Sequence, residues 1–289
     1  MTCDRNPLAL ARSFLFVPAT RPDRFAKALA SGAHAIIVDL EDAVAPHDKG
    51  SARDHLANAF GGFDPADRAR VVVRINASGT RWIADDLRLM QALVAQGLRG
   101  VMLPKAESAA ALLALQQSLG APCGLLPLVE SLAGLDAADA LAAAPRVLRL
   151  AFGNLDFQAD LGLACDPDEA ELLPVRLALV MAARRAGLAA PIDGVTVNTR
   201  DPARLQLDAA RSRRAGFGAK LCIHPAQVAI VNLAFAPSAE ELLWAQRVLA
   251  AVEAAGGGVV SLDGRMVDGP VVLLAQRTLA QDRHASSAR

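Results

Sequence analysis

The stretch Ala35-Ile-Ile-Val-Asp-Leu-Glu-Asp42 is an apolar run of strand length that ends in a cluster of carboxylates. The same design, an apolar strand that leads into charged, polar or glycine-flanked residues, recurs at 71–76, 101–105, 125–131, 147–156, 192–195 and 220–225. A (β/α)8 barrel builds its active site in this way, from residues at the C-terminal ends of its strands. The repetition therefore predicts a barrel with a functional site along one rim.

Segments of helical period separate these strands. Phe25, Ala28 and Leu29 recur at i, i+3 and i+4, and residues 83–94 keep the same rhythm. Glycines follow the helical segments at the C-cap position, namely Gly32, Gly97, Gly120, Gly187 and Gly216. With 13–17 as the first strand, strand and helix alternate eight times. This alternation predicts an α/β fold, a parallel (β/α)8 TIM barrel over residues 13–235, and no G-x-G-x-x-G motif supports a dinucleotide fold instead.

Residues 236–289 are predicted to extend the barrel as part of the same structural unit. Residues 238–255 have the pattern of a helix, and 271–280 have the pattern of a final one. Between them Gly256-Gly-Gly258 forms a flexible hinge, and residues 259–270 form a short loop. We expect a C-terminal helical extension that carries a lid loop.

The composition limits the classes of function. The chain has 289 residues with 30 basic and 30 acidic side chains, and the basic ones are scattered, so no nucleic-acid partner is expected. Its four cysteines, Cys3, Cys123, Cys165 and Cys222, form no C-x-x-C pair, which indicates reduced thiols. Residues 1–20 contain no signal-peptide core, and polar residues and glycines interrupt the charge-free stretch 108–129. We expect a cytoplasmic protein with no membrane partner.

Glu130 and Asp156 are the strongest candidates for a metal site. Each follows an apolar strand, the fifth and the sixth, so a barrel places them side by side on the rim. Two carboxylates with little other protein ligation suit Mg2+, which prefers oxygen ligands and keeps waters that a substrate can displace. The structural alternative is that Glu130 caps the next helix and Asp156 caps a helix over 157–161.

Arg74 lies inside an apolar strand, where a guanidinium is costly unless it meets an anion. Its planar fork suits a carboxylate or a developing enolate oxygen of a substrate. A buried ion pair with Asp39 or Glu41 is the structural alternative, and both interpretations can hold together. Asp39 and Glu41 are expected to orient Arg74 or a metal-bound water rather than to bind the metal.

Other reactive side chains give weaker signals. Lys105 ends a strand, but a barrel with two metal carboxylates has little need of a Schiff base. His224 is expected to be a hydrogen-bonded residue of the rim rather than a catalyst. No G-x-S-x-G motif indicates a nucleophilic serine.

Several motifs together resemble the citrate lyase β-subunit family, acyl-CoA lyases related to the HpcH/HpaI aldolases. The resemblance runs in order from about residue 13 to 280. The motifs are Phe14-Leu-Phe-Val-Pro18, Asp39-Leu-Glu-Asp-Ala-Val44, Val73-Arg-Ile-Asn76, Leu103-Pro-Lys-Ala-Glu107, Val129-Glu-Ser131, Phe152-Gly-Asn-Leu-Asp156 with Leu161-Gly162, Gly216-Phe-Gly-Ala-Lys-Leu-Cys-Ile-His-Pro225, and Asp263-Gly-Arg-Met-Val-Asp268 with Pro270. Ala19 stands where the family usually has glycine, in the region that meets the CoA chain, and Ser131 stands where threonine is common.

The resemblance implies a metal-dependent lyase, with Mg2+ or in its place Mn2+. Such an enzyme cleaves a 3-hydroxyacyl thioester, for example citramalyl-, malyl- or citryl-CoA, into an acyl-CoA and a 2-oxo acid. By this resemblance Glu130 and Asp156 hold the metal, Arg74 and Glu130 contact the substrate, and Asp268 is the acid–base group of the C-terminal loop. The family also implies a homotrimer or homohexamer in which that loop covers a neighbour's site.

Three other functions remain open at this stage. A class II aldolase would act on a free 2-oxo acid with the same metal, and a malate-synthase or thioesterase output would hydrolyse the thioester. A non-catalytic complex subunit would use the barrel as a scaffold. The carrier of the acyl group, CoA or an acyl carrier protein, also stays open.

Overall fold

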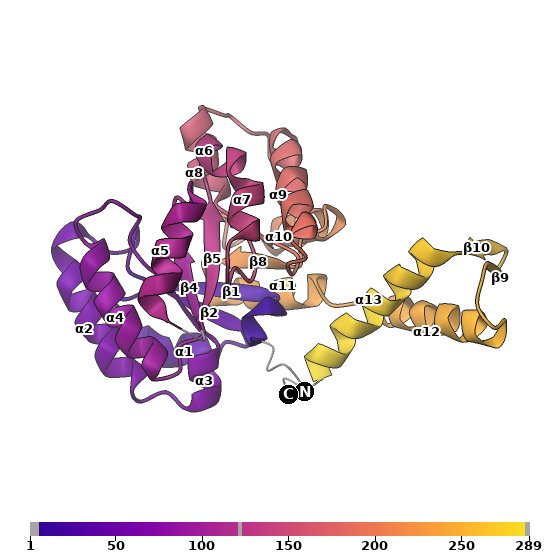
Figure 1. Cartoon of the computed structure of the whole chain (residues 1–289), viewed down its shortest axis with the longest axis horizontal. Helices are drawn as coiled ribbons and strands as arrows, with labels where there is room; N and C mark the ends of the chain where they lie inside the picture. The colour runs from indigo at the N-terminus through magenta and orange to yellow at the C-terminus, as the bar shows by residue number, and fades with distance from the viewer. Residues whose placement is uncertain (1–5, 121–122, 287–289) are drawn as a thin grey trace. The chain divides into compact units, whose positions relative to one another are not determined.

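The computed structural model describes residues 6–120 and 123–286 of the chain. Eight parallel strands close into a barrel in sequence order, and β1 pairs with both β2 and β8. Helices surround the strands (Figure 1). The strands are β1 (Ser13–Pro18), β2 (Ala35–Asp39), β3 (Val71–Arg74), β4 (Gly100–Leu103), β5 (Gly124–Val129), β6 (Ala151–Phe152), β7 (Ile192–Asp193) and β8 (Ala219–Cys222). The predicted α/β fold, a (β/α)8 TIM barrel, is confirmed.

Helices follow each barrel strand, as the sequence pattern predicts. They are α1 (Phe25–Leu29), α2 (Lys49–Phe60), α3 (Pro65–Ala69), α4 (Ile83–Ala95), α5 (Ala109–Leu119), α6 (Leu132–Asp136), α7 (Ala138–Ala143), α8 (Asn154–Leu161), α9 (Leu173–Arg185), α10 (Pro202–Arg214) and α11 (Val228–Ala234). The expected C-cap glycines have a positive φ, for example 108° at Gly97 and 97° at Gly216. Glycine adopts this left-handed conformation without the steric cost that a Cβ brings.

Alternation along the strands produces two apolar layers. Ile36 and Val38 of β2 belong to the outer cluster, which packs against the helices. Ile37 belongs to the inner cluster, together with Val72 of β3 and Leu128 of β5. Successive side chains of a strand point to opposite sides, so every second residue faces the interior of the barrel.

The same alternation positions the polar residues at the strand ends. Asp39 is two residues beyond Ile37, Arg74 two beyond Val72, and Glu130 two beyond Leu128. All three side chains therefore turn inward at the C-terminal mouth of the barrel.

The sixth strand is shorter than the sequence predicts. Val147 makes only an isolated bridge to Leu125, and the regular strand begins at Ala151. Between them the buried guanidinium of Arg149 donates hydrogen bonds to the carbonyl oxygens of Ala190 at 2.6 Å and Ala11 at 2.5 Å. This part of the chain is therefore held by a side chain rather than by a continuous strand ladder.

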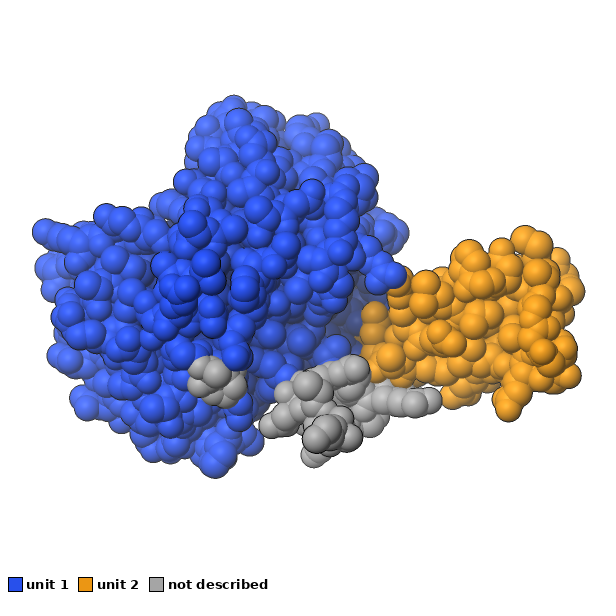
Figure 2. Space-filling model, in the orientation of Figure 1, with its two compact units in different colours: residues 1–235 blue, residues 236–289 orange. Residues whose placement is uncertain are grey.

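The chain divides into two compact units, one that ends at Phe235 and one that begins at Ala236 (Figure 2). The second unit contains α12 (Ala239–Ala254), β9 (Val260–Leu262), β10 (Arg265–Val267) and α13 (Gly269–Ser286). Ala245, Val248, Val267 and Ala275 form its core. The loop expected over 259–270 is instead a β-hairpin, because β9 and β10 pair antiparallel.

Two further expectations concern the membrane and the thiols. The stretch Pro225–Ala254 is apolar and long enough to cross a membrane, but it is not one helix. α11 ends at Ala234, and the Ser238 capping box starts α12 after Pro237, so the stretch is weak evidence for a membrane span. Cys123, Cys165 and Cys222 are free thiols, whereas Cys3 lies outside the described residues.

Candidate active site at the C-terminal mouth of the barrel

Arg74 and Asp39 form a buried, two-pronged ion pair at the mouth of the barrel. They are the last residues of β3 and β2 and face each other in the strand register. Arg74 Nε donates to Asp39 Oδ1 at 2.7 Å, and Nη2 donates to Oδ2 at 2.6 Å. The guanidinium also lies over the Phe16 ring, 4.8 Å from its centre. A fork held in this way has its orientation fixed before any substrate arrives.

Glu41 adds a second carboxylate to Arg74. Arg74 Nη1 lies 2.9 Å from Glu41 Oε2 and 3.7 Å from Asp42 Oδ2. Burial lowers the pKa of Arg74, but the hydrogen bonds that it donates to Asp39 and the nearby acidic charges outweigh this effect, so the net pKa is raised. The ion pair expected as a structural alternative is therefore present, and Asp39 and Glu41 do orient Arg74. Its contact with substrate stays a prediction.

Glu130 is a buried carboxylate directly after β5, with 3% of its surface exposed. Its Oε1 accepts a 2.7 Å hydrogen bond from the backbone N–H of Lys105 at the end of β4. The pKa of Glu130 is raised to about 8, mainly by burial and also by the charges of Glu41 and Asp156, against the opposing effects of Lys105 N–H and Arg74. Glu130 thus lies within electrostatic reach of three charged groups of the predicted site.

Asp156 lies in the first turn of α8, the helix that follows β6. Its side chain is exposed, and across residues 6–120 and 123–286 it makes no hydrogen bond or ion pair. The proposed capping roles of the two carboxylates are wrong. Ser131 caps α6 by accepting from Gly134 N–H at 3.1 Å, and Gly153 occupies the N-cap position of α8.

The site fits a hard divalent cation. Glu130 and Asp156 offer oxygen donors, and Glu41 Oε2 is buried without a hydrogen-bond donor in suitable geometry among the described residues, although Arg74 Nη1 is 2.9 Å away. The charges of Glu41 and Asp156 raise the pKa of Glu130, so the carboxylates of this rim lack positive charge that a cation would supply. No group of three or more His, Cys, Asp or Glu side chains is arranged as a metal site within the described part of the chain. Proteins usually bind Mg2+ through one or two carboxylates and leave its other coordination positions to water or substrate.

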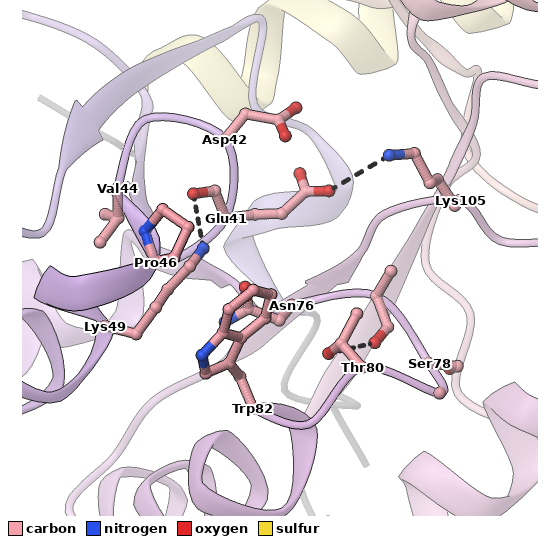
Figure 3. Close-up of a pocket in the computed structure, with 12 residues that line it drawn as sticks. Glu41, Asp42, Val44, Pro46, Lys49, Asn76, Ser78, Thr80, Trp82 and Lys105 are labelled. Carbon is pink, nitrogen blue, oxygen red and sulfur yellow. Dashed lines mark hydrogen bonds and ion pairs between the residues drawn. The ribbon is translucent and has the colours of Figure 1, made fainter.

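A pocket of about 610 Å³ opens beside Glu41 (Figure 3). Lys49 lies on one side, where its Nζ donates to the backbone oxygens of Leu40 at 2.7 Å and Glu41 at 2.8 Å. Its ammonium also lies 5.1 Å from the centre of the Trp82 ring. On the other side Lys105 Nζ is 3.9 Å from Glu41 Oε1. Lys49 therefore fixes the backbone of the acidic segment, while Lys105 leaves its ammonium half exposed to the pocket.

The remaining predicted residues have other places. His224 caps the short helix Pro225–Gln227, accepting from Ala226 N–H at 3.2 Å, which confirms a hydrogen-bonded rim residue. Asp268 belongs to the second unit, where its Oδ1 faces Val271 N–H at 3.5 Å directly before α13. The structure thus brings together Asp39, Glu41, Arg74, Glu130 and Asp156 on one rim, and it leaves the role of Asp268 a prediction.

Three contributors to the site were not found from the sequence. They are the backbone N–H of Lys105, the ammonium of Lys49 and the ring of Phe16. Only Phe16 carried a signal, since it alternates with Phe14 toward the end of β1. A backbone donor and a lysine at the start of a polar helix have no distinguishing pattern.

The chain is similar in sequence to a known protein family and to proteins of named function. The sequence model of the HpcH/HpaI aldolase/citrate lyase family matches residues 12–225. A citrate lyase subunit beta-like protein of Mycobacterium tuberculosis is 39% identical over 287 residues, covering 98% of this chain and 99% of that one. A (3S)-malyl-CoA thioesterase of Cereibacter sphaeroides is 35% identical over 273 residues, covering 93% and 94%.

A solved structure is similar over nearly the whole chain. It is the protein CitE of Mycobacterium tuberculosis in complex with magnesium, acetoacetate and coenzyme A. The TM-score is 0.80 with 38% sequence identity, and the match covers 94% of this chain and 98% of that one.

Proposed function

We propose that this chain, which belongs to the HpcH/HpaI aldolase/citrate lyase family, is a Mg2+-dependent carbon–carbon lyase for a 3-hydroxyacyl-CoA thioester. Citramalyl-, malyl- and citryl-CoA are the substrates considered, and the products are an acyl-CoA and a 2-oxo acid. The observation that carries the proposal is the oriented guanidinium of Arg74 on the same rim as the carboxylates of Glu130 and Asp156. The magnesium and coenzyme A bound by the similar CitE structure support it.

Glu130 and Asp156 would hold the metal and leave positions open for the hydroxy acid end of the substrate. When bound, Mg2+ supplies Lewis-acid stabilisation for the substrate's hydroxyl and carboxylate oxygens. Arg74 would stabilise the negative charge that develops on an oxygen as the bond breaks, and its fork is already fixed by Asp39. One such donor is typically worth about 2.7–4 kcal/mol of the barrier.

The bond that breaks joins the hydroxyl-bearing carbon to the α-carbon of the thioester. The hydroxyl proton passes to solvent water as the 2-oxo acid forms, and the electron pair of the bond passes to the thioester as an enolate. A proton must then be added at the α-carbon. We assign this step to Asp268 of a second subunit, in a cytoplasmic homotrimer or homohexamer.

A thioesterase is the second candidate, because the relative from Cereibacter sphaeroides is named a (3S)-malyl-CoA thioesterase. Hydrolysis would release free coenzyme A and a hydroxy acid, whereas cleavage releases an acyl-CoA and a 2-oxo acid. The two outputs share the substrate and differ in the bond that breaks.

The test is to incubate the protein with MgCl2 and each hydroxyacyl-CoA ester, and separately with a free 2-oxo-3-deoxy acid, the substrate class of the aldolase alternative. Chromatography of the CoA species and derivatisation of 2-oxo acids identify the products. A 2-oxo acid from a CoA ester alone supports the lyase. Release from a free acid supports a class II aldolase, free CoA with a hydroxy acid supports the thioesterase, and no product from any substrate supports a non-catalytic subunit.

A further inference from the structure

Asn154 is a buried amide, 1% exposed, at the start of α8 and two residues before Asp156. Its Oδ1 accepts from the backbone N–H of Val195 at 2.9 Å, and its Nδ2 donates to the backbone oxygen of the same residue at 3.2 Å. The side chain therefore pairs with Val195 as a neighbouring strand would. It fastens the first turn of α8 to the segment that follows β7.

A second contact ties Asn154 to a buried network of charges. Nδ2 also lies 3.1 Å from Glu169 Oε1. Glu169 pairs with Arg176 and with Arg211, and Arg176 in turn donates to the buried Asp193 at 3.0 Å. Arg176 Nη1 and Arg211 Nε have no hydrogen-bond partner among the described residues, so the network is not fully paired, but its ion pairs still restrain Glu169 and through it Asn154.

Two glycines leave the space that this arrangement needs. A Cβ at Gly194 would lie 2.1 Å from Asn154 Oδ1, so a side chain there would push the amide away from Val195. A Cβ at Gly153 would lie 2.5 Å from Glu130 Oε2. The backbone at Gly153 therefore lies close to the Glu130 carboxylate, three residues before Asp156.

We infer that Asn154 is a positioning residue that fixes Asp156 relative to Glu130, and so sets the spacing of the two carboxylates that would bind the divalent cation. The inference rests on the proposed function. Because Asp156 has no hydrogen bond or ion pair of its own within the described residues, the location of its carboxylate depends on the backbone at the start of α8. Partners that orient metal ligands from outside typically change metal affinity by about 10- to 100-fold.

The test compares Asn154→Ala with Asn232→Ala, a matched control. Asn232 makes two side-chain hydrogen bonds where Asn154 makes three, accepting from Ser13 Oγ at 2.7 Å and donating to the Gly32 oxygen at 2.9 Å. Ser13 is the first residue of β1, so this control lies at the opposite end of the barrel. Mg2+ dissociation constants are measured by calorimetry without substrate, and urea midpoints report stability. Asn154→Ala should weaken Mg2+ binding by about tenfold or more, whereas Asn232→Ala should lower only the midpoint.

Gly194→Ala reaches the same anchor without removing a polar group. Gly50→Ala is its control, since a Cβ there meets nothing within 4 Å. Gly194→Ala should weaken Mg2+ binding as Asn154→Ala does, and Gly50→Ala should not. This pair decides the question if Asn154→Ala is insoluble.

An unchanged Mg2+ dissociation constant in Asn154→Ala or in Gly194→Ala, with a lower urea midpoint, overturns the inference and makes Asn154 structural. A wild-type protein that binds Mg2+ but cleaves no thioester refutes the proposed function, while the comparison of dissociation constants still decides the role of Asn154. A wild-type protein without measurable Mg2+ binding overturns both.

Discussion

The backbone N–H of Lys105 is directed at Glu130 Oε1, 2.7 Å away, from a residue whose φ is 45°. A left-handed conformation in a residue other than glycine is strained, and such strain persists where the surroundings impose it. Here the strained residue turns a backbone donor onto a candidate metal ligand. The peptide, rather than the lysine ammonium, is therefore the part of Lys105 that contacts Glu130.

Lys105→Gly is expected to keep the Mg2+ affinity and most of the turnover. Glycine retains the N–H and adopts a positive φ without strain, so the bond to Glu130 survives. The measurements are the Mg2+ dissociation constant and kcat, with borohydride trapping of a substrate adduct on the wild type. A trapped adduct at Lys105, with turnover abolished in the variant, would instead establish a Schiff base.

Arg74→Lys is expected to lower kcat/KM by at least about tenfold, because the charge stays but the fork is lost. Lysine cannot meet both Asp39 oxygens and still present a planar donor to a substrate. Steady-state kinetics on the active CoA ester give the value. Kinetics close to wild type with a lower free energy of unfolding would limit Arg74 to its ion pair with Asp39 and Glu41.

Chelation with EDTA should abolish activity, and added MgCl2 should restore it, because the proposed ligands are hard oxygen donors. Glu130→Gln and Asp156→Asn should weaken Mg2+ binding by more than about tenfold. Loss of a residue that only supports a metal ligand typically costs at least this much, so loss of a ligand should cost more. Circular dichroism should show the fold intact, since both residues lie on the rim. Full turnover after exhaustive EDTA treatment contradicts a metal mechanism.

Asp193→Asn should destabilise the protein by about 3–5 kcal/mol, the range for removing one partner of a buried ion pair. Burial raises the pKa of Asp193, but Lys220, Arg176 and the Ser212 hydroxyl outweigh it and lower the pKa below its usual value. The carboxylate therefore stabilises the fold above its unfolded pKa of about 3.9, and this stability is lost as the pH falls through the lower folded value.

Urea unfolding at pH 7 and at pH 3 checks this linkage. The difference between wild type and Asp193→Asn should shrink at pH 3, because below the unfolded pKa of about 3.9 the unfolded chain binds a proton at Asp193 that the folded carboxylate binds only at lower pH. Asp139→Asn is the control, since its pair with Arg185 is exposed at both ends and should be worth about 0–1 kcal/mol. An equal effect of the two substitutions contradicts the importance of the buried network.

The parts of the fold that follow from local pattern could be predicted. The repeated apolar strands predicted the barrel. The alternation of side chains along each strand then placed Arg74, Asp39 and Glu130 at the same mouth. The capping roles were wrong because Ser131 competes for the helix start next to Glu130. The anchor of Asn154 on Val195 joins residues 41 positions apart, and nothing in the local sequence of either one specifies it.

The hairpin after Gly256-Gly-Gly258 was also missed. Arg265-Met-Val267 pairs with Val260-Ser-Leu262, but three residues are too few for the alternation in β9 to mark a strand, and β10 is largely exposed and does not alternate. The turn Asp263-Gly264 is the signal that could have found it, since both residues have a positive φ and Asp-Gly is typical of tight hairpins.

Asp268→Asn is expected to abolish turnover while Mg2+ binding and the second unit stay intact. Asp268 faces Val271 N–H at the start of α13, and asparagine caps helices as well as aspartate does, so the substitution removes the acid–base group and spares the cap. If the loop acts on a neighbouring subunit, mixing inactive Asp268→Asn with inactive Glu130→Gln restores some sites that hold both intact groups. Subunit exchange is verified by mass spectrometry of differently tagged chains, and recovered 2-oxo acid release is the readout. Exchange without recovery would place Asp268 over the barrel of its own chain, and full turnover of Asp268→Asn would remove it from the chemistry.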